Sequence, residues 1–143
     1  MKKQTLFVAA VALMCSNIIA CSESKTEETP VPTVEITDTN LTTLLLQKGI
    51  DTDNDGKISE KEAAAVTALD LAAAGADIQI SDITGLEKFV NLKSLVLSGH
   101  YISDLTPIEA LAGLTLLDVS DNSISTADFS ALTLLEELNI SGN

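Results

Sequence analysis

Alternating carboxylates lie in one short stretch of the chain, at Asp51, Asp53 and Asp55. Negative charges this close repel one another, and without a cation nothing evident is gained from crowding them. Calcium is a hard cation that takes several oxygen ligands, and every second side chain of a tight loop can supply one. Gly56 follows directly, and a residue without a Cβ enters the backbone conformation of a sharp turn at little cost. The stretch is therefore predicted to bind Ca²⁺.

The residues from Asp51 to Glu62 match the EF-hand calcium loop, D-x-[DN]-x-[DN]-G-x5-E, at every specified position. In this arrangement Lys57 offers its backbone carbonyl, and Ser59 binds directly or through a water. Glu62 closes the site with two carboxylate oxygens, while Ile58 points away from the metal into a core. The predicted ligands are Asp51, Asp53, Asp55, Lys57, Ser59 and Glu62.

The metal-free alternative is a polar turn followed by a capped helix. Ser59 and Glu62 form the capping box S-x-x-E before an alanine-rich run, which explains these two residues but not the three aspartates. A short amphipathic helix is predicted before the loop, with Asn40 as its cap and Gly49 at its end. Sensor EF-hands run the first helix directly into the loop and occur in pairs. This single loop after a glycine therefore favours a structural cap over a calcium switch.

The composition excludes several classes of function. The formal net charge is −13, which repels phosphate backbones and argues against nucleic-acid binding. The chain has no Arg or Trp and a single His, His100, and both cysteines lie near its start. Neither a nucleophile motif nor a catalytic cluster is evident, because the carboxylates that gather are committed to the loop. We therefore expect a protein that is not an enzyme.

The first 20 residues are predicted to be a secretory signal peptide, with a positive start followed by an apolar run too short to span a membrane. The run ends in Ile-Ile-Ala-Cys, which resembles a bacterial lipobox. That resemblance implies a lipid on Cys21 and an outer-membrane lipoprotein of a Gram-negative bacterium, since no Asp follows the Cys. Periplasmic and surface display both stay open, as does ordinary cleavage with a free thiol. Residues 21–39 are acidic and rich in Ser, Thr and Pro, and are expected to form a disordered tether.

A repeat begins near residue 86. Apolar residues recur at a spacing of 22 and then 21 residues in the pattern L-x-x-L-x-L-x-x-N-x-I, which is that of a leucine-rich repeat. Asn122 and Asn143 are expected to hydrogen-bond the backbone of each tight turn. His100 holds the same place in the first repeat, where it either bonds the turn or faces solvent. The last repeat stops without a polar cap, so we expect either a fragment of a longer array or a protein that is marginally stable or self-associating.

The order of lipobox, acidic tether, single EF-hand-like loop and repeats resembles bacterial surface lipoproteins of the internalin-like leucine-rich-repeat type. The fold implied is α/β: a short solenoid whose open end is covered by a helix–loop–helix cap. The cap is expected over residues 40–67 and the repeats over 68–143.

Leucine-rich repeats bind partners through residues that flank the inward leucines on the concave sheet. In this chain those are Ser94, Val96, Ser98, Leu116, Asp118, Ser120, Glu137, Asn139 and Ser141. The alternative is that they are only solvated strand residues. The function expected is that of a lipid-anchored, non-enzymatic adhesion or interaction module, stabilised by one calcium ion, with a protein or other surface partner. A dockerin-like docking module and a non-catalytic part of a longer cell-surface enzyme are the alternatives.

Overall fold

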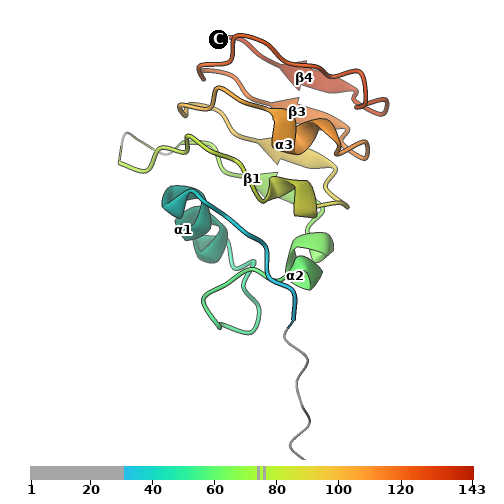
Figure 1. Cartoon of the computed structure of the whole chain (residues 1–143). Coiled ribbons are helices and arrows are strands. Elements are labelled where there is room, and N and C mark those ends of the chain that lie inside the picture. Colours follow the sequence, from blue (N-terminus) through green and yellow to red (C-terminus); the bar gives the residue numbers. More distant parts are fainter. Residues whose placement is uncertain (1–30, 74, 76) are drawn as a thin grey trace, which may run out of the picture.

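The computed structural model describes residues 31–73, 75 and 77–143. The chain coils into a stack, with helices α1 and α2 at one end and strand β4 at the other (Figure 1). The elements are α1 (Thr39–Gln47), α2 (Glu60–Ala65), β1 (Ala68–Asp70), the 3₁₀ helix η1 (Leu86–Lys88), β2 (Ser94–Val96), α3 (Thr106–Glu109), β3 (Leu116–Asp118) and β4 (Glu137–Asn139). None of the helices in this described part combines the length and apolar character needed to cross a bilayer.

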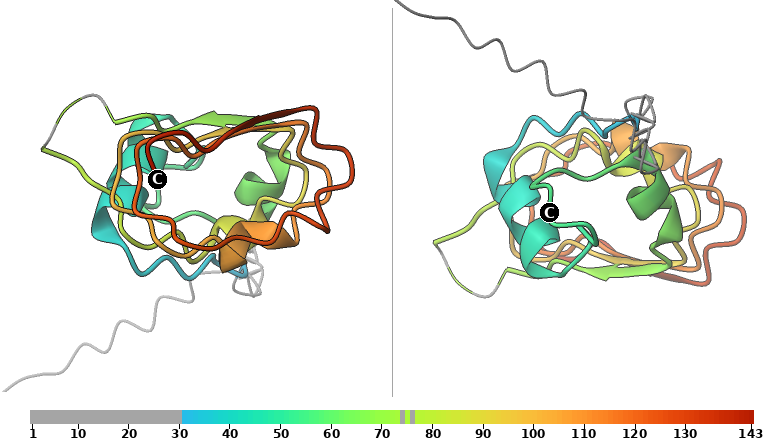
Figure 2. Two further views of the ribbon diagram at one scale, coloured as in Figure 1. Left: turned by 90° about the horizontal axis from the view of Figure 1, so that it is seen from above. Right: turned by 90° about the horizontal axis from the view of Figure 1, so that it is seen from below.

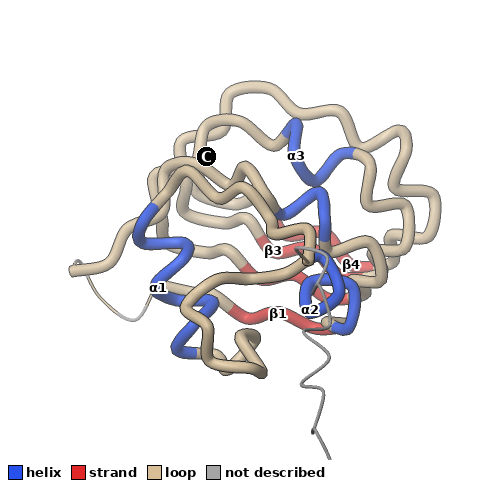
Figure 3. Tube along the Cα trace, turned by 60° about the horizontal axis from the view of Figure 1, so that its bottom comes forward, coloured by secondary structure: helices blue, strands red, loops and turns tan. Residues whose placement is uncertain are grey.

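The strands form one parallel sheet in the order β1-β2-β3-β4, so each repeat pairs with the next. The register aligns Leu69 with Leu95, Leu95 with Leu117, and Leu117 with Leu138. Side chains alternate across a strand, so these leucines point to one face, and Leu95 is fully buried. The sheet forms one side of the coil and α3 lies on the opposite side (Figures 2 and 3). The predicted leucine-rich repeat is confirmed.

The turns after β2, β3 and β4 are each held by a side chain in the place predicted for Asn. The Nδ2 of Asn122 donates to the carbonyl of Leu97 at 2.8 Å, and its Oδ1 accepts from the N–H of Ile102 at 3.0 Å. His100 does the same rather than facing solvent. Its Nε2 lies 2.7 Å from the carbonyl of Leu71, and its Nδ1 accepts from the N–H of Ile80 at 3.3 Å. Buried backbone groups of neighbouring turns are thereby paired.

The first helix has a different cap from the one predicted. Asp38, not Asn40, caps α1, because its carboxylate accepts from the free N–H groups of Asn40 and Leu41. The Asn40 side chain instead donates to the carbonyl of Gln79. The α1 residues Leu41 and Leu45 are fully buried, and the helix lies at the end of the stack opposite β4 (Figure 1).

The described end of the expected tether is not disordered. Thr33 pairs with Ser59, the N–H of Val34 donates to the carbonyl of Ile58, and the side chain of Val34 is only 8% exposed. Residues 31–38, which we call the strap, also pass Gly85, where a Cβ would lie 2.8 Å from a side-chain carbon of Ile36. Gly85 has a φ of +105°. Only a glycine fits this conformation and this close approach. The strap therefore contacts both the loop, at Ile58, and the first repeat, at Gly85.

Candidate calcium site and outer sheet face

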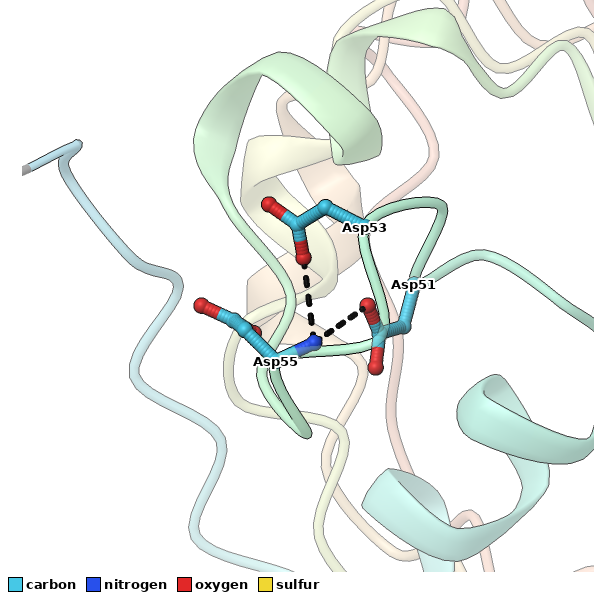
Figure 4. A group of neighbouring side chains, drawn as sticks. All are labelled: Asp51, Asp53 and Asp55. Atoms are coloured by element: carbon cyan, nitrogen blue, oxygen red, sulfur yellow. Dashed lines mark hydrogen bonds between the residues drawn. The ribbon is translucent and has the colours of Figure 1, made fainter.

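The three alternating aspartates meet in the loop between α1 and α2. One carboxylate oxygen from each of Asp51, Asp53 and Asp55 lies within 4.8 Å of the others (Figure 4). Oxygens on opposite sides of a calcium ion are about 4.6–5.2 Å apart, since each Ca–O distance is about 2.3–2.6 Å. The three oxygens are thus close enough to contact one ion, and their donor chemistry fits calcium.

Backbone hydrogen bonds fold this loop around Asp51. Its Oδ1 accepts from the N–H of Asn54 at 2.7 Å and of Asp55 at 3.3 Å, and its Oδ2 accepts from Gly56 at 2.9 Å. Asn54 and Gly56 both have positive φ, 61° and 81°, as the tight turn requires. Asp53 accepts a single bond, from the N–H of Asp55 at 3.1 Å. Asp51 therefore shapes the loop, whereas the Asp53 carboxylate is largely free to bind a cation.

The neighbouring carboxylates of the loop affect the pKa of Asp53. The N–H of Asp55 acts to lower the pKa of Asp53, but desolvation, the charges of Asp55 and Glu62 and the contact with Asp51 together raise it. A cation among these groups would relieve that repulsion.

Both carboxylate oxygens of Glu62 accept hydrogen bonds from other residues of the loop. One carboxylate oxygen accepts from the N–H and hydroxyl of Thr52, at 2.6 and 2.8 Å. The other accepts from the N–H and hydroxyl of Ser59, both at 2.9 Å, which completes the predicted capping box. Glu62 thus joins the start of the loop to the start of α2. The structure brings the three aspartates together but does not place Glu62 among them.

The remaining predicted ligands lie on the return half of the loop. Ser59 is half-buried and caps α2, while Lys57 is exposed. The neighbouring Ile58 is 2% exposed and anchors the loop in the core, as predicted. Cys21, the predicted lipidation residue, lies outside the described residues, as do the predicted signal peptide and residues 21–30 of the predicted tether.

The outer sheet face is formed by the strand residues that flank the buried leucines. These are Ala68, Asp70, Ser94, Val96, Leu116, Asp118, Glu137 and Asn139. The strand residues predicted as partner-binding all lie on this face and are half-buried or exposed. Ser120 differs, because its side chain is 6% exposed and its hydroxyl donates to Asp118. The Ser120 hydroxyl therefore holds the Asp118 carboxylate in place, and its own side chain offers little surface to a partner.

A scan against protein-family models and a search of curated proteins give no match. Solved structures do match. An internalin, InlF, of Listeria monocytogenes is 28% identical with a TM-score of 0.61, over 73% of this chain and 30% of that one. Internalin C2 of the same organism has 20% identity and a TM-score of 0.63, over 73% and 45%. A structure of the CBM51-2 and INT domains of Clostridium perfringens ZmpB has 24% identity and a TM-score of 0.54, over 64% and 18%.

The chain spans less than half the length of each of these structures. The likeness covers most of the chain itself and agrees with the observed sheet of stacked repeats. This chain therefore has an internalin-like leucine-rich-repeat fold.

Proposed function

We propose that the protein is a lipid-anchored, non-enzymatic module that binds another protein through its outer sheet face, with one calcium ion stabilising its cap. The observation that carries the proposal is the sheet itself. Leu69, Leu95 and Leu117 are buried in the core, and the strand residues that flank them form the outer sheet face. No other described element lies over this face (Figure 2). The internalin-like fold supports a role in protein interaction.

The binding surface is tested by placing a photo-crosslinking amino acid at Val96, on the outer sheet face. Val90 is the matched control, because it is the same residue type, 59% exposed and outside every strand. We expect crosslinked protein adducts in intact cells from position 96 and not from position 90. Equal labelling at both positions, or none at 96, would contradict binding at the sheet.

The calcium proposal rests on the convergence of the aspartates and on the raised pKa of Asp53. Extracellular calcium modules bind with Kd of about 10⁻⁴–10⁻³ M. At tenfold excess over Kd, a ligand that binds only the folded state stabilises it by about 1.4 kcal/mol. The ion would hold together the loop, the strap and the start of α2, which meet at Ile58 and Ser59.

Asp53→Asn separates metal binding from folding, because the amide oxygen keeps the single bond to Asp55 while the charge is lost. We expect calcium to raise the melting temperature of the wild-type protein by about 5 °C and that of Asp53→Asn by almost nothing. Without calcium the two should melt alike. Asp77→Asn, at an exposed carboxylate outside the loop, should keep the full shift. If calcium still raised the melting temperature of Asp53→Asn by the full amount, the ion would not be bound in this loop.

The lipid anchor rests on the lipobox ending at Cys21. Several acyl chains, each worth about 0.8 kcal/mol per buried CH₂, attach a protein firmly to a membrane. Mass spectrometry of the N-terminal peptide from membranes should show an acylated Cys21, and Cys21→Ala should move the protein to the soluble fraction. An unmodified thiol on the membrane-bound protein would contradict the anchor.

A further inference from the structure

The outer sheet face carries charge of one sign. Its ionisable residues are Asp70 on β1, Asp118 on β3 and Glu137 on β4, and Asp70 and Glu137 are exposed. Residues 94–143 contain seven carboxylate side chains and no Lys or Arg. Lys93 directly precedes β2, and its side chain runs toward the segment before β3, where its Nζ is 3.1 Å from the position of a Cβ on Gly113. No described side chain on the face balances its negative charge.

The register places two apolar residues between these carboxylates. Val96 pairs with Asp70 on one side and with Asp118 on the other, while Leu116 pairs with Glu137. Val96 and Leu116 are both half-buried. A shallow hollow of about 290 Å³, lined by residues 116–118 and 137–139, opens beside them. The face thus offers a small apolar centre with carboxylates around it.

Hydrogen bonds to the Asp118 carboxylate favour its charged form. Burial acts to raise the pKa of Asp118, but the hydroxyl and N–H of Ser120 and the side chain of Asn139 lower it overall. These groups lie 2.6, 2.9 and 3.1 Å from the Asp118 carboxylate oxygens. Neighbouring strands are about 4.8 Å apart. Asp70 and Asp118 are two strands apart, about 10 Å, and Glu137 lies on the strand next to Asp118. These separations are about one Debye length at 0.1 M salt, so the fields of the carboxylates add in part.

We propose that the partner of the outer sheet face is a positively charged protein segment, in which lysine or arginine side chains flank an apolar side chain. The apolar group covers Val96 and Leu116, and the cations face Asp70, Asp118 and Glu137. A neutral or acidic segment would leave these carboxylates unpaired or repelled, which costs affinity. This inference rests on the proposed binding function and specifies the chemistry of the partner at the same face.

The test uses a short synthetic peptide of lysine and leucine, with serine–leucine and glutamate–leucine peptides of equal length as charge controls. Binding to the full-length protein is measured by calorimetry at several salt concentrations. The face variant is Asp70→Asn with Asp118→Asn and Glu137→Gln. The matched variant is Glu35→Gln with Asp77→Asn and Glu109→Gln, which removes the same charge away from the sheet.

We expect the wild-type protein to bind only the lysine–leucine peptide, more weakly as salt rises. The face variant should bind it about tenfold more weakly and the matched variant about as well as wild type. Should the face variant not fold, Glu137→Lys, at an exposed position, provides the same test and should also weaken binding.

Two results would overturn the proposal. Equal weakening in the face and matched variants would mean that only the net charge of the chain attracts the peptide. Equal binding of the serine–leucine peptide, or binding of none of the three, would exclude a cationic partner. Neither result would decide whether the sheet binds a protein at all. The crosslinking experiment at Val96 tests that proposed function independently.

Discussion

Replacing Glu62 by Gln should lower the free energy of unfolding by about 3 kcal/mol, even with all calcium removed. The Glu62 side chain accepts four hydrogen bonds, from the N–H and hydroxyl groups of Thr52 and Ser59, at 2.6–2.9 Å, and the residue is only 8% exposed. The amide of Gln would turn an NH₂ group toward one pair of these donors. A buried donor left without an acceptor is costly.

The ionisation of Glu62 depends on the same hydrogen bonds. The N–H of Ser59, followed by the N–H and hydroxyl of Thr52 and the Ser59 hydroxyl, outweighs desolvation and lowers the pKa of Glu62 from 4.5 to about 2. A tenfold change in an acid dissociation constant on folding corresponds to about 1.4 kcal/mol. Because the folded-state pKa is depressed, this stability is present above about pH 4.5 and is lost as the pH falls toward 2. Denaturant unfolding across this range should show a steep acid limb that Glu62→Gln flattens.

Glu60→Gln is the matched control for Glu62→Gln. Glu60 lies in the same helix turn, but its carboxylate is exposed and pairs with Lys88 at 2.8 Å. Exposed ion pairs contribute about 0–1 kcal/mol, so this variant should change little. Equal destabilisation by the two variants would mean that the hydrogen bonds of Glu62 stabilise the fold no more than the exposed ion pair of Glu60 does. If Glu62 also binds calcium, Glu62→Gln will lose the calcium shift together with the stability.

The repeats can be predicted from the sequence because their signal is local and repeated. Leu69, Leu95 and Leu117 occupy the same place in successive units, and one slip of register would expose all of them. The convergence of the loop aspartates is equally predictable, since their spacing and Gly56 together describe one turn. Both predictions depend on residues that are close neighbours in the chain.

The strap cannot be predicted in the same way. It continues an acidic stretch rich in Ser, Thr and Pro, which is typical of a linker, and its own apolar residues, such as Val34 and Ile36, alternate with polar ones. They are ordered by Gly85, about fifty residues further along the chain, and by the backbone of Ile58. Asp38 is recognisable as a cap, because Asp is a preferred residue directly before a helix. Only its further bonds, from the N–H groups of Ser81 and Asp82, depend on a distant segment. Contacts between distant segments, not local pattern, fix this part of the fold.

His100→Ala should cost about 3 kcal/mol of stability, the second large effect that we expect. His100 is 2% exposed, and its removal leaves the N–H of Ile80 and the carbonyl of Leu71 unpaired around an empty volume. A carbonyl only accepts, so Nε2 carries the proton and Nδ1 accepts from Ile80. Each unpaired buried group costs about 1–3 kcal/mol. Tyr101→Ala, next in the chain and 63% exposed, should change stability by about 0.5 kcal/mol or less.

His100→Asn tests why this repeat departs from the Asn of the others. Leu69 and Leu95 are 26 residues apart but Leu95 and Leu117 only 22, so the first unit carries a longer connection. Imidazole reaches further from the backbone than an amide and still offers one acceptor and one donor. We expect Asn to keep only one of the two bonds and to cost about 1 kcal/mol, measured by the urea midpoint at constant slope. If His100→Asn were as stable as the wild-type protein, the longer first unit would not require a side chain longer than Asn. If it lost as much stability as His100→Ala, the amide would reach neither the N–H of Ile80 nor the carbonyl of Leu71.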